Sequence, residues 1–246
     1  MLTKLTTMLA ILPATLATTR YYPYPNNTNP TNTTYPTGTS LPTPTHHPLP
    51  IPCTTFYPTD LRILNSRYPS FDMSPLHGRT KMLMLLRQLP TTFQIATQLQ
   101  FSLPPDFAAN ATNSNANATC HLHLQLPLAS TQTVTGPQPI FNLYQVSREP
   151  GAVATWDMFD AKDVSLGGPE PPVFGQVNGT AEARERQWRE KGGVYDIGPT
   201  RCNETLTWQL GMAFDGGEEV NYWEFMNVQP PAFPSQGFRV VTGLAC

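Results

Sequence analysis

The stretch Phe93-Gln-Ile-Ala-Thr-Gln-Leu-Gln-Phe-Ser-Leu103 decides the fold class of this chain. Its odd positions are mostly apolar and its even positions mostly polar, which is typical of a strand with one face in a core and one in water. Cys120-His-Leu-His-Leu-Gln-Leu126 repeats the alternation, with its cysteine and leucines on one face. His121, His123 and Gln125 share the opposite face. Both stretches predict half-buried β-strands.

Similar patterns continue along the chain, and we expect further strands at 82–86, 140–146, 173–177, 202–212, 220–228 and 237–242. Glycine and proline separate them, as they do between strands. Only residues 181–191 differ, because seven of these eleven residues are charged and acid–base pairs recur at i,i+4 spacing. This spacing predicts one short exposed helix, and the alternative is a solvated charged loop. Residues 53–246 therefore predict one all-β domain, an antiparallel, jelly-roll-like β-sandwich of about eight to ten strands with at most one short helix.

The region before this domain predicts secretion. Lys4 is followed by a short apolar run that ends in small residues at Ala17, which is typical of a secretory signal peptide over residues 1–17. This run is shorter than the ~20 residues that a membrane span needs. Residues 18–52 are rich in threonine, proline and asparagine and predict a disordered stalk, which includes a His46-His47 pair. We therefore expect an extracellular or cell-wall location and no membrane span.

Composition narrows the class of partner. Charged residues make up 13% of the chain and the net charge is −2, which gives no electrostatic basis for binding nucleic acid or anionic lipid. Such low charge in a secreted protein calls for another source of hydration, and N-glycans supply one. Six sequons fit the acceptor pattern, at Asn26, Asn32, Asn110, Asn117, Asn178 and Asn203.

The chain has four cysteines, and an even number in a secreted chain predicts two disulfides. Their spacings are too long for a cysteine-based metal site. Cys120 and Cys202 each begin a predicted strand, in phase with its apolar face, so we pair them. This leaves Cys53 paired with Cys246, which joins the start of the domain to its end.

The pair His121-x-His123 places two imidazoles on one strand face, a spacing that some β-sandwich metal enzymes use. A nearby downstream carboxylate and a third histidine are missing, so we interpret the pair as part of a solvent-facing polar stripe. No metal site and no cofactor are predicted. Two acidic groups, 215–219 and the set Asp157, Asp160 and Asp163, lack the spacing of an EF-hand and are interpreted as solvated turn residues.

Two further observations bear on ligands. Glu204 and Glu224 are the only acids that fall within predicted strands, so a glycosidase, which needs two carboxyl groups about 5–9 Å apart, would use them. Five aromatic residues are candidates for a sugar-stacking platform: Trp156, Trp188, Trp208, Tyr222 and Trp223. Trp208 lies on an apolar face and is interpreted as core. Aromatic side chains point both ways around Tyr222 and Trp223, so one of these two is expected to be exposed and to bind a ligand.

Several stretches carry a resemblance to a known family: 56–60, 119–127, 141–146, 174–179, 202–212 and 237–241. Together they resemble fungal secreted proteins with the But-two carboxy-terminal domain, a family named for binding a subunit of a ubiquitin-like-activating enzyme. The resemblance covers most of residues 53–246. It implies a β-sandwich without an established enzymatic activity, so no catalytic residue is transferred from the family.

These observations favour a secreted, glycosylated, monomeric and non-catalytic β-sandwich that is wall-associated or binds a ligand, with a cell-wall glycan or a secreted protein as partner. The first alternative is a carbohydrate-active enzyme that uses Glu204 or Glu224. The second alternative is binding to a ubiquitin-like-activating enzyme, as the family name implies.

Overall fold

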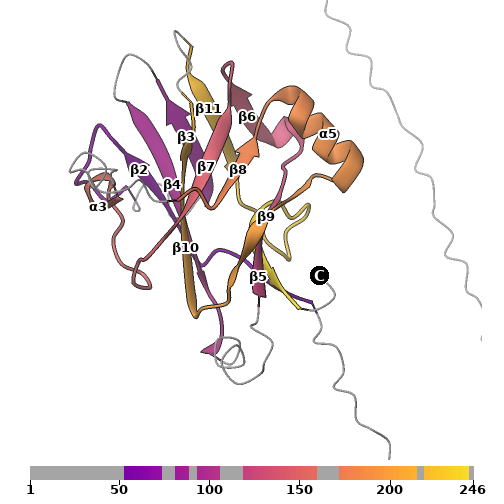
Figure 1. Ribbon diagram of the computed structural model, residues 1–246. Helices are drawn as coiled ribbons and strands as arrows, with labels where there is room; N and C mark the ends of the chain where they lie inside the picture. The colour runs from indigo at the N-terminus through magenta and orange to yellow at the C-terminus, as the bar shows by residue number, and fades with distance from the viewer. Residues whose placement is uncertain are drawn as a thin grey trace, which may run out of the picture. The chain divides into compact units, whose positions relative to one another are not determined.

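The structure is a computed structural model that describes residues 53–73, 81–88, 93–105, 119–159, 172–214 and 219–243 (Figure 1). The expected signal peptide over residues 1–17 and the stalk over residues 18–52 lie outside the described residues. The described parts of residues 53–246 fold into an all-β antiparallel sandwich, so the predicted fold class is confirmed.

The described residues form twelve strands, which exceeds the expected eight to ten. The strands are β1 (Thr54–Phe56), β2 (Asp60–Asn65), β3 (Met82–Arg87), β4 (Gln94–Ser102), β5 (Thr119–Gln125), β6 (Gln132–Thr135), β7 (Ile140–Val146), β8 (Gly175–Asn178), β9 (Val194–Arg201), β10 (Thr205–Met212), β11 (Asn221–Met226) and β12 (Gly237–Thr242). The helices are α3 (Trp156–Phe159), α5 (Ala181–Lys191) and the 3₁₀ turn η1 (Ala129–Thr131). In the part of the chain that is described, neither α-helix is long and apolar enough to span a membrane.

The strands form two sheets that enclose one core. The smaller sheet has the order β1-β12-β5-β9, and the larger has the order β6-β11-β3-β4-β10-β7-β8, with β2 also paired to β4 (Figure 1). Both sheets contribute side chains that are fully buried, such as Leu122 and Phe238 from the smaller one. The largest are two tryptophans, and that of β10, Trp208, packs edge-on against Phe101 with ring centroids 5.5 Å apart. The interpretation of Trp208 as a core residue is confirmed.

The expectation that the strand at 93–103 is half-buried is wrong: β4 is buried on both faces, with its polar Thr97, Gln98 and Gln100 covered as well as its apolar residues. The predicted alternation does hold in β5. In β5 the leucines are fully buried and the histidines are half-buried on the outer face.

Cys120 and Cys202 form a disulfide with Cα atoms 5.1 Å apart, which confirms the predicted pairing. Cys202 does not begin a strand, because it lies in the connection between β9 and β10, but its side chain is still buried. Cys53 is disulfide-bonded, and its expected partner, Cys246, lies outside the described residues.

The predicted helix at 181–191 is confirmed as α5, and the one-turn helix α3 is an addition to the single helix expected. Thr180 accepts a hydrogen bond from the Ala183 amide at the start of α5. Gly192 ends the helix in the left-handed conformation that glycine adopts without steric cost. The Gln187 side chain donates to the Val194 carbonyl, which joins the last turn of the helix to β9.

Candidate functional site

The two carboxylates proposed for an enzyme are not brought together. Glu204 is exposed in the connection ahead of β10, rather than within a strand, and its carbonyl accepts a hydrogen bond from the Leu103 amide. Glu224 lies in β11 opposite Met84, whose amide donates to the Thr97 hydroxyl. Thr97 lies in β4 and Leu103 directly follows it, six positions further along, which corresponds to about 20 Å of extended chain. The geometry therefore does not provide the carboxyl pair of a glycosidase.

The two aromatic residues proposed for ligand binding lie on opposite faces of β11. Trp223 is fully buried in the core, where its indole N–H donates to the Gln132 side chain at 2.9 Å. The hypothesis that it contacts a ligand at the surface is therefore wrong. Tyr222 is half-buried on the outer face, and its hydroxyl donates to the Glu224 carboxylate. Burial and this carboxylate together raise the pKa of Tyr222 well above its ordinary value.

Trp188, the third candidate, is exposed and held in one orientation. Its indole covers the backbone of Gly193, where a Cβ atom would lie 2.8 Å from the ring, so only glycine fits there. The Gly193 carbonyl accepts from the Leu126 amide at 2.8 Å, which ties the end of α5 to the end of β5. The Gln125 side chain donates to the Gly192 carbonyl at 3.2 Å and strengthens this junction. The ring is thus fixed on one side and open to solvent on the other.

A groove lies beside this ring, with a volume of about 250 Å³. We call it the Trp188 groove, and its lining residues come from the end of β5, from α5 and from the β11–β12 loop: Gln125, Leu126, Leu128, Trp188, Phe233, Pro234, Ser235 and Gln236. Phe233 is 94% exposed and Trp188 is 37% exposed. The loop that carries Phe233 is anchored by Gln236, which donates to the Met226 carbonyl at 3.0 Å and accepts from the Thr131 hydroxyl at 3.1 Å.

Two aromatic rings and a few amide and hydroxyl groups give the groove a defined chemistry. An exposed aromatic ring can stack on an apolar face of a ligand, while neighbouring polar groups hydrogen-bond its rim. A sugar ring has these two features, since its C–H groups form flat faces and its hydroxyls point outward. The Trp188 groove therefore has the composition of a shallow carbohydrate subsite.

The histidine pair of β5 has the carboxylate that the sequence interpretation considered missing. Asp196 lies opposite His123 on the neighbouring strand β9, and its Oδ1 atom is 3.6 Å from His123 Nε2 and 3.4 Å from His121 Nδ1. We call these three residues the His–Asp cluster. Their ligand atoms all lie within 4.8 Å of one another, so these side chains are suited to hold a metal ion.

The electrostatics of the His–Asp cluster favour a neutral His123. Burial lowers its pKa below the ordinary value of 6.5, and the charges of Arg239 and His121 lower it further. The carboxylate of Asp196 acts in the opposite direction. Arg239 lies on β12 directly opposite His123, so cationic and anionic side chains flank this imidazole on its two neighbouring strands.

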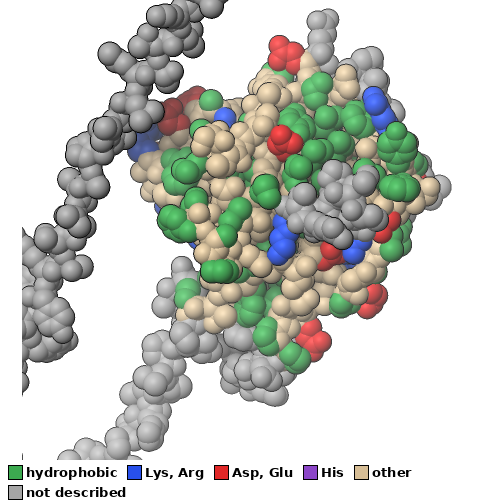
Figure 2. All heavy atoms as spheres, turned by 180° about the vertical axis from the view of Figure 1, so that it is seen from behind, with side chains coloured by type: hydrophobic (Ala, Val, Ile, Leu, Met, Phe, Trp, Pro, Cys, Tyr) green, Lys and Arg blue, Asp and Glu red, His purple; other side chains and the backbone are tan. Residues whose placement is uncertain are grey.

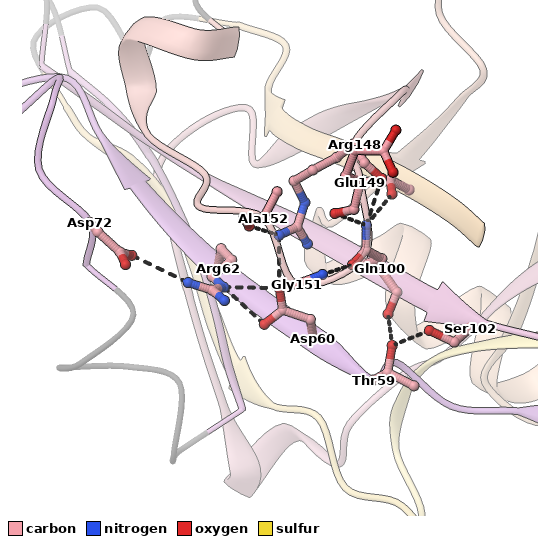
Figure 3. Close-up of polar contacts among 11 residues, drawn as sticks. Thr59, Asp60, Arg62, Asp72, Gln100, Ser102, Arg148, Glu149, Gly151 and Ala152 are labelled. Atoms are coloured by element: carbon pink, nitrogen blue, oxygen red, sulfur yellow. Dashed lines mark hydrogen bonds and ion pairs between the residues drawn. The ribbon is translucent and has the colours of Figure 1, made fainter.

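A second polar cluster occupies the outer face of the larger sheet, under residues 148–156 (Figure 3). Its members, which we call the Arg148 cluster, are Asp60, Arg62, Gln100 and Arg148. The Arg148 side chain is 2% exposed and donates to Asp60 at 2.8 Å and to the Ala152 carbonyl at 2.6 Å. Gln100 donates to the Arg148 carbonyl at 3.0 Å. This cluster attaches the segment after β7 to β2 and β4.

The remaining predicted positions divide between described and undescribed residues. Asn203 is exposed, and Asn178 is half-buried with its side-chain oxygen accepting from the Thr180 amide at 2.9 Å. The other sequons, Asn26, Asn32, Asn110 and Asn117, lie outside the described residues, as do Asp160, Asp163 and residues 215–218. Asp157 and Glu219 are exposed. Occupancy of all six sequons stays a prediction.

Charged side chains are few and separated on the face shown in Figure 2, with hydrophobic and polar side chains interspersed. In comparisons with known proteins, no family model matches the chain and no curated protein matches it. The features of the described residues that bear on function are the Trp188 groove and the two polar clusters.

The sequence interpretation missed Asp196 and Phe233. Asp196 lies in β9, which was not among the expected strands, because Gly198 and Pro199 interrupt its pattern. The Val-Tyr-Asp-Ile order at 194–197 was the available signal for that strand. Phe233 lies in a proline-rich loop, where no periodicity indicates which side chains are exposed.

Proposed function

We propose that this protein is a secreted, glycosylated and non-catalytic β-sandwich that binds a cell-wall glycan in the Trp188 groove. The observation that supports this most is the pair of exposed rings, Trp188 and Phe233, which flank a groove of about 250 Å³ with polar groups at its rim. Large apolar side chains that stay exposed beside a concave surface are a common mark of a binding site.

The orientation of Trp188 adds to the argument. A ring that rests on the Gly193 backbone loses little freedom when a ligand stacks on it, so binding costs less conformational entropy. The extracellular setting is inferred from the predicted signal peptide, the sequons and the disulfide-bonded cysteines. A wall glycan is the partner that matches both the setting and the groove.

Co-sedimentation of the secreted chain with insoluble β-glucan and chitin tests this function. We expect retention by at least one polysaccharide, and a loss of tenfold or more in affinity for both Trp188→Ala and Phe233→Ala. Phe71→Ala removes a ring that is 55% exposed and does not line the groove, and it serves as the matched control. Circular dichroism of each variant checks folding, and Phe233→Ala changes a side chain with almost no packing.

Three results would contradict the proposal. The first is that the chain binds neither polysaccharide, and the second is that the control loses as much affinity as the groove variants. The third is that the groove variants keep polysaccharide binding and lose binding to a secreted protein instead. The secretory setting is tested separately, by the mass of the chain expressed in a eukaryotic host before and after enzymatic removal of N-glycans. An unchanged mass and free thiols would contradict it.

A further inference from the structure

The His–Asp cluster is assembled by an irregularity in strand pairing. His121 pairs with Pro199, but after a register shift between Leu122 and His123 the partner of His123 is Asp196. The shift inserts one extra residue, Ile197, into β9. Without it, the residue opposite His123 would be Ile197. A β-bulge often re-aims a side chain in this way, and here it places a carboxylate beside two imidazoles.

The spacing of the three ligand atoms distinguishes two explanations. A hydrogen bond between nitrogen and oxygen spans about 2.7–3.2 Å, whereas the distances from Asp196 Oδ1 to the two imidazole nitrogens are 3.4 and 3.6 Å. A tetrahedral ion with bonds of about 2.0–2.1 Å holds its ligand atoms about 3.3 Å apart. The 3.4 Å contact is a long hydrogen bond and the 3.6 Å contact exceeds hydrogen-bond range, whereas both are close to the separations around a shared ion. All three ligand atoms lie within 4.8 Å of one another, so a bound ion would draw the two imidazoles closer together.

We infer that His121, His123 and Asp196 form a binding site for one divalent transition-metal ion, with Zn²⁺ as the ion that suits them best. Two imidazoles and one carboxylate are a common zinc ligand set, and three protein ligands leave a fourth position for water or for a group of a bound molecule. The Asp196 side chain is 58% exposed and that of His121 is 39% exposed, so an ion can enter from solvent.

Two neighbours define what this site can do. Arg239 opposite His123 carries a like charge, which weakens cation binding and favours an anionic group at the fourth position. Gln125 lies two residues after His123 on the same face of β5, about 7 Å from His123 along the strand. Gln125 also lines the Trp188 groove. The metal site is therefore next to the groove, but it does not depend on which ligand the groove binds.

Isothermal titration with ZnCl₂ of the whole secreted chain, dialysed first against a chelator, tests the site. We expect one Zn²⁺ per chain, and a loss of tenfold or more in affinity for His123→Ala and for Asp196→Asn. The double variant His46→Ala/His47→Ala removes the other histidine pair and should retain the binding. Co²⁺ should give the intense visible absorption of tetrahedral coordination in the wild type and not in His123→Ala.

The proposal is overturned by any of three results. The first is that zinc at millimolar concentration does not bind the wild type. The second is that both His123→Ala and Asp196→Asn still bind zinc, and the third is that His46→Ala/His47→Ala alone abolishes the binding. The Asp196 side chain is 58% exposed and Asn has almost the same shape, so Asp196→Asn is expected to fold even if His123→Ala does not.

Discussion

The Arg148 cluster and the His–Asp cluster both lie on outer faces of the sandwich, but they differ in what covers them. Residues 148–156 lie over the first cluster, so that the Arg148 side chain is 2% exposed and has the carboxylate of Asp60 as its counter-charge (Figure 3). No described segment lies over the second cluster in the same way: the side chains of Asp196 and His121 are 58% and 39% exposed, and its contacts of 3.4 and 3.6 Å are long for hydrogen bonds.

This difference separates a structural role from a binding role. A buried charge requires a partner within the protein, because desolvation is costly and no water can replace that partner. An exposed group has no such requirement, since water solvates it at little cost. The Arg148 cluster thus contributes to stability, and the His–Asp cluster has lone pairs available for an ion.

The largest effect expected from this comparison is on stability. Asp60→Asn removes the counter-charge of the buried Arg148 guanidinium and should lower the free energy of unfolding by about 3–5 kcal/mol. Asp196→Asn makes the same chemical change at an exposed position and should alter it by less than about 0.5 kcal/mol. Urea unfolding of the two variants measures both values. Equal losses would show that the two clusters do not differ in role.

Zinc should have the next largest effect, and only through the open cluster. If the His–Asp cluster binds Zn²⁺ in the folded state alone, zinc at one hundred times its Kd adds about 2.7 kcal/mol to the free energy of unfolding. For a domain of this size that raises Tm by about 5–10 °C. Thermal unfolding with and without ZnCl₂ measures the shift, which should be absent in Asp196→Asn. A shift of the same size in that variant would mean that zinc binds elsewhere.

Two glutamines give a matched test of the same comparison. Gln100 is 1% exposed and accepts from the Gly151 amide at 3.2 Å besides donating to the Arg148 carbonyl, so Gln100→Leu leaves buried polar groups unpaired. We expect a loss of about 1–3 kcal/mol in the free energy of unfolding. Gln125→Leu removes the hydrogen bond to the carbonyl of the exposed Gly192, which water can replace, and should cost about 0.5–1 kcal/mol. If chemical denaturation gave the opposite order, the assignment of the covered cluster to stability would be wrong.

The sequence predicts best those structural features that depend on residues close together in the chain. Alternation in β4, β5 and β10 and the charge pairs of α5 involve neighbours in sequence, so they predicted the fold class and the Cys120–Cys202 disulfide. The strand β2 has buried residues on both faces, because Leu61 lies in the main core and Leu64 lies against Ala154. This pattern does not alternate, and the strand was not expected.

The candidate sites were less predictable because each is made by residues far apart in sequence. His123 and Asp196 are brought together by the pairing of β5 with β9 and by its bulge, neither of which a local pattern encodes. Glu224 and Trp223 were correctly placed in one strand, but a strand alone does not indicate which face the core covers. The packing of the core against one face of β11 places Trp223 inside, where its ring contacts Phe141.

The smallest expected effect concerns the half-buried pair of Tyr222 and Glu224, which is intermediate between the covered and the open cluster. The pKa of Tyr222 is raised in the folded protein, so the neutral hydroxyl is favoured there, and its contribution to stability is complete below the unfolded pKa of about 10. That contribution should diminish as the pH rises above 10 toward the folded-state pKa. Urea midpoints of the wild type should therefore fall more steeply with pH in this range than those of Tyr222→Phe.

Glu224→Gln keeps an acceptor but removes the charge. The slope of its urea midpoint against pH should lie between those of the wild type and Tyr222→Phe, because the carboxylate is only part of the cause. Parallel slopes in all three proteins would place this pair with the solvent-exposed cluster.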